Sequence, residues 1–280
     1  MNCKRIGRKF LRLAALLPLL AATLPATAGD DFGVWTSVAA EKEVTKKLSF
    51  EGSLEFRAEN KLRSATRWDV SVGADYKLWK FLKVSGGYVY IYDRSLQETK
   101  VNFNNSGKEN GYNVDHGFWR SKHRAHFDLT FKHKLGRFEL SLRERYQFTH
   151  YRPADCLRDR YRDEALAGDQ GDFYEWNGRK FYSFEQVPEH KSTRNRHYLR
   201  SRLQLEYDIK GLPLAPAVSY EMSNDFSDAF DIAKHRVTAG ADWKVNKKNV
   251  ISLNYIYENG ADDDSDGNAH VISVGYKLKF

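Results

Sequence analysis

The chain has 280 residues, of which 41% are hydrophobic, and a mean hydropathy of −0.67. This composition excludes a bundle of apolar membrane-spanning helices, but it fits a barrel, because a barrel strand needs only every second residue to be apolar. Lysine and arginine number 45 against 37 aspartate and glutamate residues, which gives a net charge of +8. No nucleic-acid-binding motif accompanies this excess, so we expect no nucleic-acid partner.

The N-terminal residues have the pattern of a secretory signal peptide. Five basic residues precede an apolar run over 13–24, which is too short to span a bilayer comfortably. The small-x-small site Ala26-Thr27-Ala28 follows, so we expect residues 1–28 to be cleaved and Gly29 to begin the mature chain. The remaining chain has 40 basic and 37 acidic residues, a charge of +3, so most of the basicity belongs to the export signal. Only Cys156 then remains, which excludes an intrachain disulfide.

Alternation of apolar and polar residues recurs along the rest of the chain, and a period of two is typical of strands with two different faces. We expect strands over 32–44, 48–57, 67–78, 82–92, 125–131, 138–148, 199–209, 218–222, 237–245, 251–257 and 269–280. Glu144 interrupts the apolar face of its strand, which predicts a β-bulge there. No helical periodicity competes with these patterns.

The connections between these strands alternate in length. Short basic turns are expected near 46–47, 79–80, 134–136, 210–213 and 246–248. Longer links are expected over 59–63, 93–118, 152–193, 224–233 and 259–268. Short turns at one end and long loops at the other are typical of outer-membrane barrels, with the short turns on the periplasmic side. Within 152–193, the dipeptide Asn177-Gly178 predicts a β-hairpin.

The number of strands conflicts with the general rule. The eleven expected segments are odd in number, whereas bacterial single-chain barrels have an even number. We therefore expect ten or twelve strands. In the first case the segment 31–44 is not a full strand, and in the second a strand is missed near 98–118.

Alternation alone does not decide which face points inward, because a soluble lipocalin-like barrel shows the same pattern. The loop asymmetry, the tyrosine-rich apolar faces and a last strand that ends on Phe280 favour the membrane barrel. The final residues resemble the closing strand of bacterial outer-membrane barrels. This resemblance implies that Phe280 is an assembly signal and that the barrel assembly machinery and outer-membrane lipid are partners.

Four further phrases carry a resemblance that covers most of the mature chain. They are D-F-G-V-W at 31–35, Y-K-L-W-K-F-L-K-V-S-G-G-Y at 76–88, H-R-A-H-F-D-L at 123–129 and R-E-R-Y-Q-F at 143–148. These phrases resemble an uncharacterised bacterial family, a domain of unknown function whose members are predicted outer-membrane β-barrels. The resemblance implies the fold and the cell outer membrane of a Gram-negative bacterium, and it implies no chemistry.

Taken together, these patterns predict an all-β protein. We expect an antiparallel, up-and-down transmembrane β-barrel of 10–12 strands with short periplasmic turns. Residues 29–280 are expected to form this single domain, with long outer loops at 93–118 and 152–193.

The faces opposite the apolar ones carry a near-balanced set of charges, which is able to form an ion-pair network that fills the lumen. One group stands out, because three neighbouring strands place five arginines at a similar height. They are Arg124, Arg143, Arg145, Arg200 and Arg202. Guanidinium groups at low dielectric repel one another, so they require carboxylates or a bound anion. Asp128, Glu139 and Glu206 are the expected carboxylate partners if the lumen is closed. An open lumen would instead be an anion-attracting, porin-like constriction.

Two outer links are acidic. The segment 262–267 reads D-D-D-S-D-G, the first half of a calcium-binding loop, but position twelve is Ser273, which excludes an EF-hand. The candidate ligands for a weak Ca²⁺ or Mg²⁺ site are Asp225, Asp228, Asp231, Asp262, Asp264 and Asp266. The alternative is a solvated acidic loop without a metal, and no other cofactor is expected.

Three functions remain open. The first is a narrow passive pore with an arginine-lined lumen, and the second is a non-conducting scaffold or receptor that acts through its outer loops. The third is a lipid-modifying enzyme, for which His126, Asp128 and Ser141 are the only grouping that the strands bring together. No G-x-S-x-G or H-E-x-x-H motif occurs, so we assign no catalytic residue and expect a protein that is not an enzyme.

Overall fold

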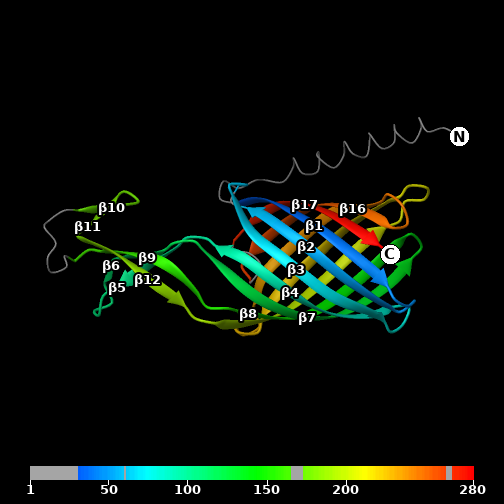
Figure 1. Cartoon of the computed structure of the whole chain (residues 1–280), viewed down its shortest axis with the longest axis horizontal. Coiled ribbons are helices and arrows are strands. Elements are labelled where there is room, and N and C mark those ends of the chain that lie inside the picture. Colours follow the sequence, from blue (N-terminus) through cyan, green and yellow to red (C-terminus); the bar gives the residue numbers. More distant parts are fainter. Residues whose placement is uncertain (1–30, 60, 165–172, 263–266) are drawn as a thin grey trace, which may run out of the picture.

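The computed structural model describes residues 31–59, 61–164, 173–262 and 267–280. The expected signal peptide and Gly29 lie outside them. Eleven strands form a closed barrel in the order β1-β17-β16-β15-β14-β13-β8-β7-β4-β3-β2 (Figure 1). The strands are β1 (Asp31–Glu43), β2 (Leu48–Glu59), β3 (Ser64–Lys77), β4 (Leu82–Ser95), β7 (Phe118–Leu135), β8 (Phe138–Tyr151), β13 (Arg194–Tyr207), β14 (Leu214–Asp225), β15 (Ile232–Lys244), β16 (Asn249–Gly260) and β17 (Ala269–Lys279). The all-β barrel is therefore confirmed.

The expectation of ten or twelve strands is wrong. The segment at 31–44 forms a full strand, β1, and it pairs with β17 in parallel from Asp31↔Ala269 to Glu41↔Lys279. All other barrel pairs are antiparallel. In an up-and-down order with an odd number of strands, the first and last strands run in the same direction. Closure of eleven strands therefore requires one parallel pair.

The two ends of the barrel differ as the loop lengths predict. The short turns and the end of β17 lie at one end, and the long links lie at the other (Figure 1). We call them the short-turn end and the long-loop end. Because the strand number is odd, β1 begins at the long-loop end. The described part of the chain contains no helix that is long and apolar enough to cross a membrane.

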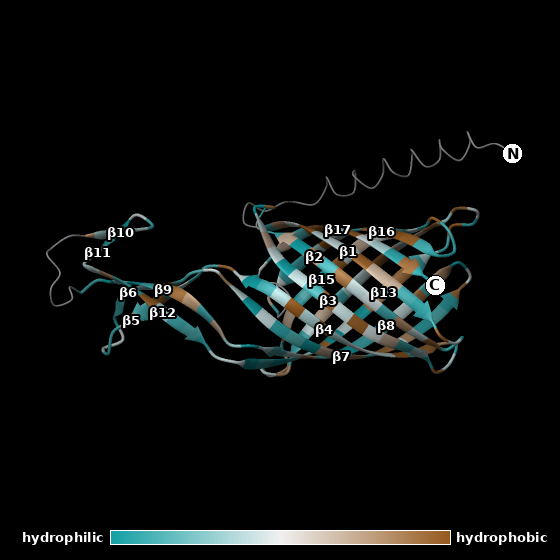
Figure 2. Ribbon diagram, viewed as in Figure 1, coloured by the Kyte–Doolittle hydropathy of each residue, from teal (hydrophilic) through white to brown (hydrophobic). Residues whose placement is uncertain are grey.

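The barrel is apolar outside and charged inside. Figure 2 shows hydrophobic and hydrophilic residues alternating along its strands. The outward side chains of Leu54, Val72 and Val218 are 59%, 58% and 48% exposed. The inward side chains of Gln147 and Glu258 are fully buried. This arrangement is the reverse of a water-soluble barrel, which buries its apolar face.

The two longest links form a second sheet beyond the long-loop end (Figure 1). Its strands are β5 (Glu98–Phe103), β6 (Glu109–Asp115), β9 (Ala154–Arg162) and β12 (Ser183–Lys191), in the order β12-β9-β6-β5. The strand that we expected near 98–118 is therefore present, but it belongs to this outer sheet and not to the barrel. The central pair, β6 and β9, joins segments that are far apart in the sequence, with Tyr112 opposite Tyr161.

The predicted hairpin on Asn177-Gly178 is confirmed. It consists of β10 (Tyr174–Trp176) and β11 (Arg179–Phe181), with Trp176 paired to Arg179. Asn177 and Gly178 have φ angles of 49° and 76°, and two central residues with positive φ are what this type of turn requires. The hairpin delivers Phe181, which is fully buried, to the outer sheet.

The bulge predicted at Glu144 is wrong. Glu144 keeps its register between Leu129 and Ser201, and its carboxylate accepts a hydrogen bond of 2.5 Å from the Ser201 hydroxyl. A polar partner on the next strand satisfies the carboxylate, so the strand does not need to turn it away. The barrel strands are irregular instead at Arg57/Ala58 and at Ser223/Asn224.

Candidate functional site: an arginine-lined lumen

The middle of the barrel encloses a cavity of about 480 Å³ whose wall is rich in arginine. All five arginines of the predicted group line it, and three more arginines join them from other strands. The full set is Arg57, Arg67, Arg124, Arg143, Arg145, Arg200, Arg202 and Arg236. The carboxylates on the same wall are Glu55, Asp69, Glu206, Glu221 and Asp242. Two more carboxylates, Asp128 and Glu258, bind Arg145 and Arg236 of this wall, so eight arginines meet seven carboxylates and one positive charge is in excess.

Strand register explains why the arginines cluster. Arg145 on β8 lies directly opposite Arg200 on β13, and Arg143 lies opposite Arg202. Like charges in directly opposite cross-strand positions destabilise a sheet. The two pairs therefore depend on carboxylates from neighbouring strands.

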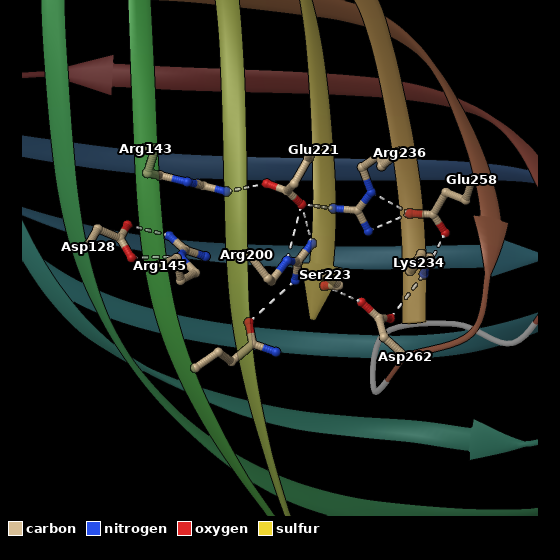
Figure 3. A network of polar contacts seen from close by, with 11 residues as sticks. Asp128, Arg143, Arg145, Arg200, Glu221, Ser223, Lys234, Arg236, Glu258 and Asp262 are labelled. Carbon is tan, nitrogen blue, oxygen red and sulfur yellow. Dashed lines mark hydrogen bonds and ion pairs between the residues drawn. The ribbon is translucent and has the colours of Figure 1, made fainter. Parts of the chain in front are cut away.

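Glu221 on β14 is the main partner. Its carboxylate accepts hydrogen bonds from Arg200 at 2.6 Å, from Arg236 at 3.4 Å and from Arg143 (Figure 3). The Glu221 side chain is only 5% exposed. A buried carboxylate that binds three guanidinium groups holds β8, β13, β14 and β15 together in the barrel wall.

The ion pairs continue along the wall on both sides of Glu221. On β7, Asp128 accepts two hydrogen bonds of 2.7 Å from Arg145 (Figure 3). On the other side, Arg236 donates to Glu258, and Lys234 lies 3.1 Å from the carboxylates of both Glu258 and Asp262. The network therefore runs from β7 to the link after β16.

Of the carboxylates expected to neutralise the five arginines, Asp128 does so and Glu139 does not. Glu139 lies near the short-turn end and pairs with Lys132 at 2.7 Å. Glu206 lines the cavity. Arg202 lies beside Glu221 in register, but its Nε atom is buried without a hydrogen-bond partner among the described residues. Arg202 therefore lies directly opposite Glu221 without a described hydrogen bond to it.

Further cavities lie above and below the arginine-lined one. A cavity of about 420 Å³ toward the short-turn end shares Arg143, Arg145 and Arg202 with it. Toward the long-loop end, a cavity of about 110 Å³ shares Arg67 with it. That small cavity shares Arg194 with a rim cavity of about 480 Å³. Separate cavities with some common wall residues therefore lie at several heights in the barrel.

An apolar cluster narrows the lumen beside the arginines. Trp35 packs with Ile256, Ala269 and Val271, and the Arg57 guanidinium lies 3.8 Å from the centre of the Trp35 ring. Trp35 is buried, and its indole N–H donates to Glu59 at 3.0 Å. An aromatic side chain therefore occupies part of the barrel interior beside the arginines.

Three cations gather around one aromatic ring at the mouth of the long-loop end. The Tyr151 ring is buried beneath Arg120, Lys122 and Arg194, whose cationic groups lie 5.2, 4.6 and 4.1 Å from its centre. Cations over an aromatic face are held by its quadrupole. The entrance thus holds cations beside Asp225, Asp228, Asp231 and Asp262, and Lys122 is itself paired with Asp93.

The acidic rim gathers only part of the predicted metal ligands. Asp225, Asp228, Asp231 and Asp262 line the rim cavity, whereas Asp264 and Asp266 lie outside the described residues. Asp225 pairs with Arg196 at 3.2 Å and Asp262 pairs with Lys234. Within 31–262 and 267–280, apart from the undescribed positions, no three acidic, histidine or cysteine side chains are placed to hold a metal. The Ca²⁺ or Mg²⁺ site stays a prediction.

The possible catalytic grouping lies inside the barrel. His126, Asp128 and Ser141 line the 420 Å³ cavity together, but Asp128 is already bound by Arg145. The His126 Nδ1 atom has no hydrogen-bond partner in the described part of the chain, and its ring lies against Gly87. Side chains on the inner face do not reach a lipid on the outer face.

Phe280 follows β17 at the short-turn end, where its N–H donates to the carbonyl of Glu41 at 3.0 Å. Its ring is exposed, and the ammonium group of Lys42 lies 5.4 Å from the ring centre. Its role in assembly stays a prediction.

The sequence predicted a near-balanced set of charges on the inner face, but it did not predict the contacts of Glu221, Arg236 and Glu258. It also missed Lys234 and Trp35. The signal available in the sequence was the alternation along each strand, which indicates whether a residue lies on the inner or the outer face of the barrel. Which strands are neighbours follows only from the closed order of the barrel.

Two comparisons with known proteins complete the description. A search of the curated proteins found no match. The model of the family described as "Protein of unknown function (DUF2490)" matches residues 32–269, which run from the start of β1 to the start of β17. This match covers more than four fifths of the chain. The protein therefore belongs to the DUF2490 family.

Proposed function

We propose that this protein is an outer-membrane barrel that conducts small anions through its arginine-lined lumen. The observation that carries the proposal is the excess of arginine over carboxylate in the central cavity, together with the cavities above and below it. Rings of positive side chains favour anions in pores.

The location is supported by the outer surface of the barrel. Large apolar side chains cover it, whereas water-soluble monomers rarely expose a contiguous apolar patch of more than a few hundred Å². A bilayer is the environment in which an apolar exterior and a charged interior are both stable, and a closed barrel leaves no strand edge unpaired in lipid.

The selectivity is supported by how the charges are distributed. Glu221 and Asp128 neutralise the arginines of the wall in part, and Arg202 remains beside the cavity. The cations around Tyr151 would give anions a contact on the way into the lumen, beside the aspartates of the rim. Trp35 would limit passage to small, hydrated anions.

The test is conductance of the purified protein in planar bilayers under a salt gradient. We expect small currents whose reversal potential indicates anion preference. Arg202→Gln should shift the reversal potential toward zero, because it removes a charge that the ion pairs do not require. Arg137→Gln is the matched control, since Arg137 is exposed in the short turn between β7 and β8 and lies outside the lumen. A wild type that inserts without conducting would overturn the pore.

A second candidate function is a binding platform, and the outer sheet favours it. Val114, Tyr161 and Phe181 form its buried core, so the two long links are an ordered unit. Both of its edge strands, β5 and β12, lack a second neighbour in this sheet. A variant in which flexible linkers replace residues 98–115 and 154–191 would separate the two functions. A pore needs only the barrel, whereas a platform needs the sheet.

A further inference from the structure

The outward face of the barrel carries five histidines near the long-loop end of their strands. They are His123 on β7, His150 on β8, His197 on β13, His235 on β15 and His270 on β17. Each side chain is half-buried and shares its face with apolar residues such as Phe127 on β7. His133 also lies on this face, but it is near the short-turn end.

Four of these histidines make the same contact with a tyrosine of the neighbouring strand. The hydroxyl and the Nδ1 atom share a hydrogen bond in Tyr88–His123 at 2.6 Å, Tyr146–His197 at 2.7 Å, Tyr220–His235 at 2.6 Å and Tyr255–His270 at 2.6 Å. His150 bonds instead to Asn195 at 2.8 Å. We call the five histidines and these four tyrosines the Tyr–His belt.

The register of the four pairs is identical. The tyrosine is never directly opposite its histidine but two residues further from the long-loop end. Tyr90, Phe148, Met222 and Tyr257 occupy the directly opposite positions. Diagonal neighbours on one face are within reach of long aromatic side chains. The same diagonal contact at four places is a property of the belt and not of a single site.

The contact determines where the second ring nitrogen points. The two nitrogens of an imidazole lie on opposite sides of the ring, so Nε2 is directed away from the tyrosine. With the tyrosine hydroxyl as donor to Nδ1, the ring proton resides on Nε2, which is then a hydrogen-bond donor. In this tautomer, His123, His197 and His235 of the belt each carry an Nε2–H group on the outward face of the barrel.

The charges near the belt complement an anion. Among the described residues of the barrel strands, Glu144 is the only carboxylate on the outward-facing side of the alternation. It lies further from the long-loop end than the belt and is bonded to Ser201. Arg152 is exposed directly after β8, and Asp228 and Asp231 are exposed in the link after β14. On the strand faces themselves, donors without neighbouring carboxylates suit phosphate oxygens, whereas aromatic residues alone suit any interface.

We propose that the Tyr–His belt, through His123, His197 and His235, binds phosphate groups of lipids in the outer leaflet. This inference rests on the proposed membrane location but not on conduction. The lipid provides the acyl chains for the apolar surface below the belt and the phosphate at the height of the N–H groups.

The test titrates lipid A that bears its phosphates, and the dephosphorylated lipid, into the detergent-solubilised full chain and measures binding by native mass spectrometry. The triple variant His123→Phe, His197→Phe and His235→Phe keeps the aromatic rings and removes the nitrogens. We expect about tenfold weaker binding of the phosphorylated lipid, since hydrogen bonds to charged groups are lost. His133→Phe is the matched control and should bind as the wild type does. Equal binding by the triple variant, or no preference of the wild type for the phosphorylated lipid, would overturn the proposal.

Two further arms separate the outcomes. If the triple variant fails to fold, Tyr88→Phe, Tyr146→Phe and Tyr220→Phe remove only the orienting hydroxyls, and a weaker phosphate preference is still expected. Competition by millimolar inorganic phosphate as strong as that by the lipid would identify a free-anion site and overturn the lipid site. A chain that does not insert into bilayers would overturn the proposed membrane location. Arg202→Gln should change conduction and leave lipid binding unchanged, so this variant tests the pore separately from the lipid site.

Discussion

The barrel and the outer sheet are built from the same chain with opposite placement of charge. In the barrel, Glu221 and Arg200 are buried and large apolar side chains cover the outside. In the outer sheet, Phe181 and Val114 are buried, and an ion pair such as Arg160–Glu185 lies at the surface. The apolar side chains of the outer sheet face its own core, whereas those of the barrel lie on its outside, where the proposed bilayer would cover them.

This difference teaches how far strand alternation can be interpreted. Both regions have a two-residue period, so the pattern alone does not say which face is inside. Whether the strands enclose a volume decides which face is inside. The closed barrel encloses an interior that contains buried ion pairs and cavities. The outer sheet is a single sheet, and it buries one face against Trp176 and Phe181 of the covering hairpin. The predictions below test this contrast.

The largest effect is expected at the centre of the lumen. Glu221→Ala would leave Arg143, Arg200 and Arg236 without their shared carboxylate and should cost about 3–5 kcal/mol of the free energy of unfolding. Urea unfolding of the barrel in detergent micelles measures the loss. Glu185→Ala in the outer sheet is the control, because its pair with Arg160 is exposed and should contribute less than about 1 kcal/mol. Equal losses of unfolding free energy in Glu221→Ala and Glu185→Ala would contradict the expected difference between the buried and the exposed ion pairs.

The second-largest effect is expected in the core of the outer sheet. Phe181→Ala should destabilise this sheet by about 3 kcal/mol, because it empties a fully buried aromatic position. Limited proteolysis should then cleave the outer sheet while the barrel remains intact. Phe173→Ala removes an exposed ring of the same size and should leave the cleavage pattern unchanged. Simultaneous loss of the barrel would show that the two regions are one cooperative unit.

An acid-dependent effect of intermediate size is expected at Asp115 of β6. Arg158 donates to its carboxylate at 2.5 and 3.0 Å and Lys191 at 2.5 Å. The hydrogen bond from Arg158 is the main cause that lowers the pKa of Asp115 from 3.8 to about 2. A lowered pKa in the folded state means that the pairs stabilise the sheet above pH ~4 and lose this contribution, about 2 kcal/mol, as the pH falls from ~4 to ~2.

Hydrogen exchange of the β6 and β9 amides measures this acid dependence. Asp115→Asn should make exchange faster at neutral pH and remove the change between pH ~4 and ~2. The barrel amides serve as an internal control in the same sample. An acid dependence that persists in Asp115→Asn would assign it to another carboxylate.

The smallest effect is expected at Arg202. Arg202→Gln should leave the free energy of unfolding of the barrel nearly unchanged, because Arg143 on one side repels this charge and Glu221 on the other attracts it. Arg200→Gln is the comparison, since Arg200 binds Glu221 at 2.6 Å, and it should be destabilising by about 1–3 kcal/mol. Thermal unfolding of both variants decides the order. A larger loss for Arg202→Gln would place this arginine within the ion-pair network.

Much of the fold follows from local sequence. A period of two marks a strand wherever it occurs, so the eleven barrel segments were found without knowledge of their neighbours. The Asn177-Gly178 turn is equally local, since both residues tolerate positive φ. The inward position of Arg124, Arg143, Arg145, Arg200 and Arg202 also follows from parity.

The expectations that were wrong depend on neighbours. Glu144 was expected to disturb its strand because nothing in its own segment satisfies a carboxylate, but Ser201 is brought beside it by β13. Glu139 was expected to bind the arginines, but it lies too near the short-turn end and meets Lys132. In both cases the partner is set by cross-strand register, which one segment does not contain.

The sequence by itself therefore determined the strands, their two faces, the ends at which the turns lie and the arginines of the inner wall. Only the tertiary structure decided that eleven strands close through a parallel β1–β17 pair, and that two distant links pair as β6 and β9. It also decided that Glu221 binds three arginines and that four tyrosines reach histidines diagonally. The physical reason is that alternation is a property of one strand, whereas closure and pairing are properties of all strands together, and register fixes which side chains meet.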